Sequence, residues 1–354
     1  MSALKKVRTP KISWNLISKY RMELFGLAAV FVMLQHSHRL IWPLRLQVLD
    51  QIAGQINGID IFIFLSGVGL YYSYNRNPNV RNYFKRRMQR ILPTFFSVAI
   101  PFYLIKSIVF KYPIVYSLMG ILTLDYWFFD SIFWYIPFIM ILYGLFPLLN
   151  KYILNNKYRT ITFLIIWVCA TILFCVLFGW KEQHILRGLT RIPVFVLGAC
   201  CSRAVFEKKE ISVIFPIVCI VIYLFMTIIS YVVFHNMPGM SESTARALSL
   251  LITIYSYIFI SYAVMLLGSA AMERITWLKP IRIGLAWLGE FSLEIYLVHC
   301  AIKELYLNTN FGKAHQQAAY YFLLILPISI VLAAGIKRLL KPWYLSRSRC
   351  LPQK

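Results

Sequence analysis

Four ionisable side chains in strongly apolar surroundings are the residues of this chain best placed to do chemistry. They are His36 in FGLAAVFVMLQHSH, Asp60 in GIDIFIFLSG, and Glu294 and His299 in LGEFSLEIYLVH. An ionisable group inside the hydrocarbon layer of a membrane is costly, so it is a candidate functional site by default. A carboxylate beside an imidazole fixes the tautomer and strengthens a general base. The alternatives are a histidine that reaches the lipid headgroups and an ion-pair network that only sets helix packing.

The composition indicates that these residues belong to a membrane protein. The sequence is 60% hydrophobic and 14% charged, with a mean hydropathy of +0.66, and a soluble domain could not bury so much apolar surface. The predicted fold class is therefore all-α, a polytopic bundle of about ten membrane-spanning helices. The expected spans lie near residues 22–41, 57–75, 91–110, 132–150, 160–178, 188–206, 212–234, 248–271, 285–303 and 319–340.

The distribution of positive charge predicts the topology. The formal net charge is +24, but the basic residues fall in short loops between hydrophobic segments, which is the positive-inside pattern rather than a nucleic-acid-binding surface. With both termini in the cytoplasm, about 27 of the 37 Lys and Arg residues lie on the inner side. Segment 112–129 contains Asp125 and several aromatic residues, so we expect an interfacial or re-entrant piece. A true span there would invert the later topology.

The chain is expected to form one integral-membrane domain over residues 1–354, with its core at about 20–342, in the plasma membrane of a bacterium. The seven cysteines form no C-x-x-C pair and most lie inside apolar runs, so neither a disulfide framework nor a metal site is predicted. The basic stretch before the first span has no small-residue cleavage pattern, so a cleaved signal peptide is not expected. The oligomeric state is left open.

Helix direction sets the depth of the candidate residues. His36 lies roughly 22 Å beyond Arg21 along a helix that runs outward, and therefore in the outer half of the membrane. Asp60 opens a span that starts outside, Glu294 falls near mid-depth, and His299 lies near the outer end of the ninth span. Two histidines and two carboxylates from three helices are thus predicted to meet.

A basic cluster, FKRRMQRILP, stands at the cytoplasmic start of the third span. Arg86 and Arg90 are four residues apart, and Arg87 and Arg90 are three apart, so these pairs are neighbours on the helix surface. Guanidinium groups in this arrangement suit phosphate, which arginine binds bidentately. The alternative is a positive-inside anchor that contacts anionic lipid.

Five sequence blocks in matching order resemble the acyltransferase 3 family of integral-membrane acyltransferases. GIDIFIFLSG resembles that family's "GvDlFFfLSG" block, FKRRMQRILP resembles its "F..RR..RI.P" block, and the upstream helix ending in LQHSH has the fitting spacing. Three later segments resemble further helices of the family: SIFWYIPFIMILYGLFPLL, RIPVFVLGACCSR and LGEFSLEIYLVH. The blocks span nearly the whole chain, and the match is specific as a set.

This resemblance implies transfer of an acyl group, usually acetyl, from cytoplasmic acyl-CoA to a hydroxyl of a glycan or other cell-envelope acceptor. It implies acetyl-CoA as donor substrate, no tightly bound cofactor, the lipid bilayer as surroundings and no nucleic-acid partner. Carried over by position, His36 is the family's essential histidine, and Arg86, Arg87 and Arg90 occupy its arginine block. Capsule, O-antigen, exopolysaccharide, peptidoglycan and a small secreted metabolite are all open as acceptors, and so is the acyl chain length.

The sequence departs from the family pattern at two positions. Many members have arginine eleven residues before the histidine, where this chain has Phe25. Arg21 lies one turn earlier on the same face, so either it takes over that role or the role is absent. Glu294 stands where the family often has glycine, and we treat it as particular to this protein.

Together these residues predict a mechanism. The arginine cluster would hold the phosphates of CoA at the inner side, and the pantetheine arm would reach up the bundle. His36 would act as general base on the acceptor hydroxyl, or would itself be acylated. Asp60 would orient the imidazole, as the third member of a triad does. The supporting polar cluster is Glu294, His299 and Arg21.

Three aromatic residues could stack on a sugar or hydrogen-bond to it: Trp134, Tyr135 and Tyr296. Membrane proteins also gather aromatic residues at the two interfaces, so a packing role is the alternative for all three.

The alternative function is a transporter or exporter of an acidic or glycan-linked solute, because buried charges and a polar pocket would fit it too. No inverted repeat or pair of Gly/Pro-broken helices is visible in the sequence to support it. Acyl-CoA hydrolysis or acyl transfer in detergent would separate the two classes.

Overall fold

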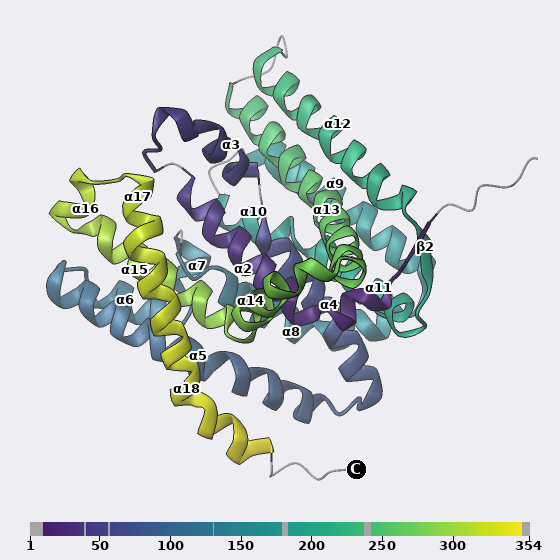
Figure 1. The fold of residues 1–354 in the computed structure, drawn as a ribbon, viewed down its shortest axis with the longest axis horizontal. Helices are drawn as coiled ribbons and strands as arrows, with labels where there is room; N and C mark the ends of the chain where they lie inside the picture. The colour runs from purple at the N-terminus through teal and green to yellow at the C-terminus, as the bar shows by residue number, and fades with distance from the viewer. Residues whose placement is uncertain are drawn as a thin grey trace, which may run out of the picture.

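The structure is a computed structural model that describes residues 10–348, apart from residues 39, 56, 130, 179–182 and 237–241. Almost all of the described chain is helical, and the predicted all-α membrane bundle is confirmed. In the ribbon of Figure 1, α2 and α14 lie near the middle, whereas α12 and α18 lie at opposite edges.

The elements of the first half follow one another as β1 (Lys11–Ser13), α1 (Asn15–Lys19), α2 (Arg21–Ser37), α3 (Gln47–Gln55), α4 (Gly58–Arg76), α5 (Val80–Val109), α6 (Ile114–Ile121), α7 (Asp125–Phe128), α8 (Tyr135–Leu149) and α9 (Lys157–Phe178). Those of the second half are α10 (Gln183–Leu189), α11 (Ile192–Phe206), β2 (Glu210–Ser212), α12 (Ile214–Asn236), α13 (Glu242–Arg274), α14 (Lys279–Glu290), α15 (Ser292–Asn308), α16 (Asn310–Ala314), α17 (Ala318–Tyr320) and α18 (Leu326–Ser348).

Seven described helices are long and apolar enough to cross a membrane. They comprise α5, α9, α12 and α13, together with the longer stretches Tyr135–Leu154, His184–Phe206 and Ala318–Trp343. Only 17% of the apolar window is buried in α9 and in α12, against 61% in His184–Phe206. The first two helices therefore face the surroundings of the bundle, and the third stretch belongs to its interior.

The predicted count of ten spans is not confirmed by length and composition. Of the three remaining predicted spans, the one at 22–41 corresponds to α2, which has 17 residues, and the one at 57–75 to α4, which is polar at both ends. The span predicted at 285–303 corresponds to α14 and α15, a pair bent by 73° that raises the number of spans to eight if it counts as one. The sequence pattern could not predict this bend, because both helices continue the same apolar run.

Segment 112–129 forms only short helices, as expected for an interfacial piece. The longer of them, α6, has eight residues, about 12 Å, and is too short to cross a bilayer. It is tied to α5 by a hydrogen bond of 2.6 Å between the hydroxyls of Ser107 and Ser117. The next helix, α7, is tied to α5 by the hydroxyl of Tyr103, which donates to Asp125 Oδ2 at 2.8 Å.

Glycine lets the central helices approach each other closely, as small residues do in membrane proteins. On the contact between α4 and α11, a Cβ atom at Gly67 would overlap the carbonyl oxygen of Phe195, and one at Gly198 would overlap that of Phe64. The contact between α2 and α14 is built in the same way, because a Cβ atom at Gly289 would overlap the carbonyl oxygen of Met22. These contacts hold α4, which carries Asp60, and α2, which carries His36, in the middle of the bundle.

The segments predicted to lie in the cytoplasm meet at one end of the structure. β1 pairs antiparallel with β2, with Ile12 opposite Ile211, which links the N-terminal segment to the turn after α11. Lys19 forms an ion pair of 2.7 Å with Glu273 at the end of α13, and Tyr20 also donates to this carboxylate. The two-stranded ribbon was not predicted, since three-residue strands leave no pattern in a sequence.

The segments predicted to lie outside meet at the other end. Ile41, after α2, forms a parallel bridge with Gln317, before α17. Lys106 near the end of α5 forms an ion pair of 3.3 Å with Glu304 near the end of α15. The grouping of loops by charge and the grouping by contact therefore agree, although contact alone does not say which end is cytoplasmic.

Gly198→Val should destabilise the bundle, because the new side chain meets backbone that cannot move aside. Overpacking of this kind costs about 1–3 kcal/mol, which thermal unfolding in detergent would report as a lower midpoint. The matched control is Gly144→Ala in α8, where a Cβ atom meets nothing within 4 Å. Equal midpoints for Gly198→Val and the control would contradict the close contact of α4 with α11.

Candidate active site

A cavity in the middle of the bundle is the main candidate site. It holds about 760 Å³ of unoccupied space, a figure that includes the open solvent at its mouth. Ile59 and Ser66 of α4 both line it, so it extends at least about 10 Å along that helix. Its lining residues are Arg21, Phe25, Ile59, Phe62, Ser66, Arg87, Arg90, Ile91, Tyr135, Ile139, Tyr143, Ser292, Leu293 and Tyr296.

One end of the cavity is strongly basic. Among the described residues that line it, three are arginines and none is Asp or Glu. Arg87 is held in place by neutral groups: it donates to the hydroxyl of Ser73 at 2.8 Å, and its guanidinium lies 5.8 Å from the ring centre of Tyr143 and 6.0 Å from that of Tyr83. Such aromatic contacts orient the side chain without cancelling its charge.

Arg21 reaches the same end of the cavity from α2. It donates to the carbonyl of Leu65 at 3.2 Å, and its guanidinium lies 5.3 Å from the ring centre of Phe25. Gly69 on α4 leaves room for it, since a Cβ atom there would overlap the guanidinium. Arg21 therefore stands beside the position at which many family members have arginine, and Arg86, which was expected to join the phosphate site, lies outside the cavity lining.

Glu294 was expected to meet the two histidines, but it lies instead beside the basic end of the cavity. Because the helix breaks at Phe291, Glu294 falls in the first turn of α15, where a negative charge is favourable. Its Oε1 lies 3.5 Å from Nζ of Lys337, and the hydroxyl of Thr94 donates to it at 3.4 Å. It lines a small side pocket with Arg90 and Lys337.

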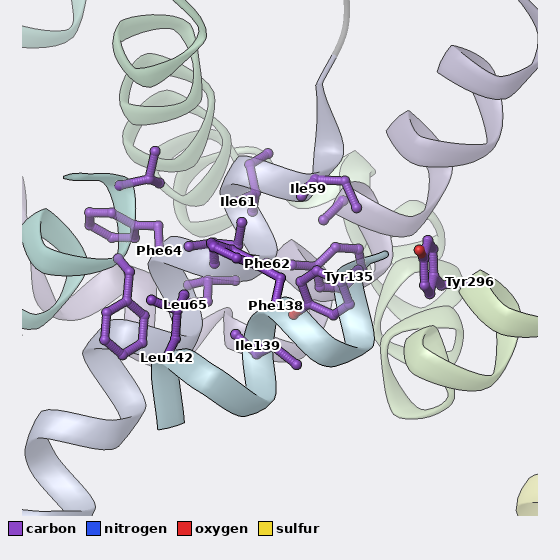
Figure 2. Close-up of a cluster of buried hydrophobic side chains, with 14 of the residues drawn as sticks. Ile59, Ile61, Phe62, Phe64, Leu65, Tyr135, Phe138, Ile139, Leu142 and Tyr296 are labelled. Atoms are coloured by element: carbon purple, nitrogen blue, oxygen red, sulfur yellow. The ribbon is translucent and has the colours of Figure 1, made fainter. Parts of the chain in front are cut away.

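The other end of the cavity is aromatic. Tyr135 on α8 lies between Phe62 on α4 and Tyr296 on α15, with ring centres 6.5 Å and 5.5 Å away (Figure 2). Tyr296 donates to the carbonyl of Ile132 at 3.1 Å. Its ring centre lies 6.2 Å from that of His299, one turn further along α15. Neither histidine lines the cavity, and Tyr296 is the lining residue that packs against His299.

Trp134 is not among the residues that line the cavity. It is only 8% exposed, and the guanidinium groups of Arg191 and Arg187 lie 5.3 Å and 5.7 Å from its ring centre. These contacts favour packing, which was the alternative role given for Trp134 from the sequence, and its contact with a substrate stays a prediction.

The two predicted histidines do meet, at the C-terminal end of α2. Nδ1 of His36 lies 2.6 Å from Nε2 of His299. His299 is fully buried, whereas His36 is half-buried and keeps an accessible surface. Nζ of Lys303 donates to the carbonyl of His36 at 2.5 Å, and this fixes the last turn of α2. His36 is therefore the less buried member of the pair.

Asp60 does not orient His36, contrary to the expected triad. Its Oδ1 lies 3.2 Å from Nε of Arg191, at the start of α11, and its Oδ2 accepts from the amide of Asn57 at 3.1 Å. Asp60 and Arg191 are both buried, and a buried carboxylate requires such a partner. The carboxylate thus joins α4 to α11 and supports the helix that carries the cavity wall.

Three neighbours of the expected site residues were missed from the sequence: Arg191, Lys303 and Cys300. Arg191 pairs with Asp60. In the sequence, this arginine was noted only as part of the block RIPVFVLGACCSR. Cys300 follows His299 directly, and its Sγ lies 3.7 Å from Nε2 of that histidine. The adjacency of Cys300 to a candidate histidine was the only signal that could have suggested it.

A family model described as an acyltransferase domain matches residues 26–338. The chain matches no curated protein and no solved structure. The matched region includes the histidine pair, Arg87 and Arg90 and both ends of the cavity, and it begins five residues after Arg21. With this match over most of its length and a bundle of apolar helices, the protein belongs to the acyltransferase 3 family and is a multi-pass membrane acyltransferase.

Proposed function

We propose that the protein transfers an acyl group, acetyl in the first instance, from cytoplasmic acyl-CoA to a hydroxyl of a glycan or other cell-envelope acceptor. His36 acts as the general base, and the enzyme works in the plasma membrane of a bacterium. One observation carries the proposal: a single cavity has arginines at one end and reaches the neighbour of His299 at the other. No contact among the described residues favours the alternative of a transporter.

The basic end of the cavity suits the phosphates of CoA. Arg21 and Arg87 are held by a carbonyl, a hydroxyl and aromatic rings, and no described carboxylate pairs with either of them. A charge that is oriented but not neutralised favours an anionic ligand, and arginine binds phosphate in two parallel hydrogen bonds. Arg90 adds a third guanidinium between the cavity and the side pocket of Glu294.

The apolar middle of the cavity suits the pantetheine arm and the acyl group. Phe25, Ile59, Phe62 and Ile139 are among the apolar residues that line the cavity, and Phe62 packs against Tyr135. Exclusion of water from this part protects the thioester from hydrolysis and strengthens electrostatic interactions around its carbonyl. The arm then directs the thioester past Tyr296 toward His36, and the acceptor hydroxyl arrives from the outer face.

The role of His36 as base predicts the effect of its removal. His36→Ala should lower acyl transfer from acetyl-CoA by at least about 100-fold, the usual contribution of a positioned general base. Release of CoA thiol by the purified protein in detergent, with methyl glycosides as trial acceptors, measures this. His235→Ala, at an exposed histidine of α12, is the matched control and should retain full turnover. Half of the wild-type rate in His36→Ala would remove this residue from the mechanism.

The arginine end predicts a loss of donor binding. Arg87→Gln and Arg90→Gln should each weaken binding of acetyl-CoA by about 1.5–3 kcal/mol, the range for a hydrogen bond to a charged group. Calorimetric titration with acetyl-CoA would show this as a Kd raised roughly 10- to 150-fold. Arg81→Gln, which changes an exposed arginine of the same helix outside the cavity, should leave the Kd unchanged. An equal loss of acetyl-CoA affinity in all three variants would show that the arginines act only through the general positive charge of the surface.

Sidedness links the topology to the reaction. Single cysteines introduced at Gln47 and Asn310, in a chain without its native cysteines, should react with an impermeant thiol reagent added to intact cells. A cysteine introduced at Asn77 should react only after the cells are opened, because the positive-inside distribution puts that loop in the cytoplasm. Labelling of the Asn77 position in intact cells, with the Gln47 position protected, would refute transfer from an inner donor to an outer acceptor.

A further inference from the structure

The hydrogen bonds of the two histidine rings decide which ring nitrogen of His36 is basic. Nδ1 of His299 lies 2.7 Å from the carbonyl oxygen of Ile295. A carbonyl oxygen can only accept a hydrogen bond, so Nδ1 of His299 carries a proton. In neutral His299 the other nitrogen, Nε2, is then an acceptor, and it lies 2.6 Å from Nδ1 of His36. Nδ1 of His36 must therefore donate, which leaves Nε2 of His36 without a proton.

We propose that His299 is a positioning residue that holds His36 in the Nδ1–H tautomer, so that Nε2 of His36 is the basic atom of the reaction. This inference rests on the proposed function. The buried imidazole of His299 takes the place that Asp60 had been expected to fill, and it does for His36 what the carboxylate of a Ser-His-Asp triad does for its histidine. The chain of donors and acceptors ends at the backbone of α15.

The acceptor oxygen bonds to the carbonyl carbon of the thioester, and its proton passes to Nε2 of His36. The carbon–sulfur bond then breaks, and the proton passes from Nε2 to the departing CoA thiolate. While His36 carries both protons, the hydrogen bond from its Nδ1 to His299 strengthens, because the donor is then charged.

The surroundings of the pair fit this division of roles. His299 has no exposed surface, so it cannot meet a substrate, whereas His36 is only half-buried. Lys303 fixes the backbone of His36, and the bond to Ile295 fixes the ring of His299. The thiol of Cys300 is a weaker neighbour, with its Sγ 3.7 Å from Nε2 of His299 and 3.9 Å from Nδ1 of His36.

A metal ion is the competing interpretation of the same three side chains. The ligand atoms of His36, His299 and Cys300 all lie within 4.8 Å of one another. Two nitrogens bound at 2.0–2.1 Å to one tetrahedral zinc ion would be about 3.3 Å apart. The observed 2.6 Å between the two nitrogens is shorter, so the distance favours a shared proton, and a bound metal becomes an outcome of the test.

The first experiment reads the tautomer without reference to activity. Magic-angle-spinning NMR of the full chain in lipid bilayers, labelled with ¹⁵N-histidine, separates protonated from unprotonated ring nitrogens. The chain has only six histidines, and His36→Ala and His299→Ala assign the two signals. We expect a protonated Nδ1 and an unprotonated Nε2 for His36, with the Nε2–H tautomer taking over in His299→Phe.

A protonated Nε2 on neutral His36 in the wild type would overturn the proposal. So would a His36 tautomer that His299→Phe leaves unchanged, or ring signals that shift when a chelator such as EDTA is added, because that result would assign a metal instead. These outcomes do not depend on any reaction, and the wild-type spectrum is decisive even if a variant fails to fold.

The second experiment separates positioning from a structural role. His299→Phe should lower kcat for acetyl-CoA at least about 100-fold, with KM for acetyl-CoA within twofold of wild type, because the donor contacts the other end of the cavity. His299→Gln, whose amide oxygen can accept from Nδ1 of His36, should recover at least about tenfold of that loss. Cys219→Ala, which changes a buried cysteine of α12 outside the cavity lining, is the control and should change neither constant.

The outcomes also separate this inference from the proposed function. If His36→Ala keeps its activity, the assignment of the base is wrong and the proposed function falls with it. If His36→Ala is inactive while His299→Phe turns over normally, the base stands and the positioning role of His299 is refuted. A parallel rise of KM and fall of kcat in His299→Phe, without recovery in His299→Gln, would mark a structural role and also refute the proposal.

Discussion

The cost of an ionisable group in the membrane interior is the constraint on which the rest of this structure depends. Each of two buried carboxylates forms an ion pair with a neighbouring basic side chain: Asp60 with Arg191, and Glu294 with Lys337. Two arginines escape this rule, because Arg21 and Arg87 are oriented by carbonyl, hydroxyl and aromatic groups alone. Under the proposed function, the phosphates of CoA supply the partner that these two charges lack within the described protein.

Much of the architecture could be predicted from sequence, because it follows from hydropathy and loop charge. The all-α bundle follows from the apolar segments, and loops sorted by charge do gather at two opposite ends. The meeting of His36 and His299 was predictable from helix direction and depth, since the sequence pattern places both near the outer ends of helices that are predicted to run outward, and the structure brings the two rings into contact. The position of Arg21 beside Phe25 was predictable from helical spacing alone.

The partner of each charge could not be predicted, because it depends on helix rotation and on breaks in helices. Asp60 has the depth that a triad would need, yet α4 packs on α11 through glycine contacts that bring its carboxylate to Arg191. Glu294 follows a bend of 73° that no residue pattern announces, and so it falls in the first turn of α15 beside Lys337. In both cases the depth of a residue along its helix was not enough to predict its ion-pair partner, because the partner is set by how the helices pack.

In the proposed function, the phosphates of CoA bind at the arginine end of the cavity, and the acyl group passes the aromatic end to reach His36, which lies outside the cavity lining. The most direct test is an electron cryo-microscopy map of the protein with CoA bound. The account predicts density for the phosphates at Arg21, Arg87 and Arg90, with the CoA sulfur beyond Tyr296 and next to His36. Phosphate density at any other surface, or a sulfur directed away from the histidine pair, would contradict it.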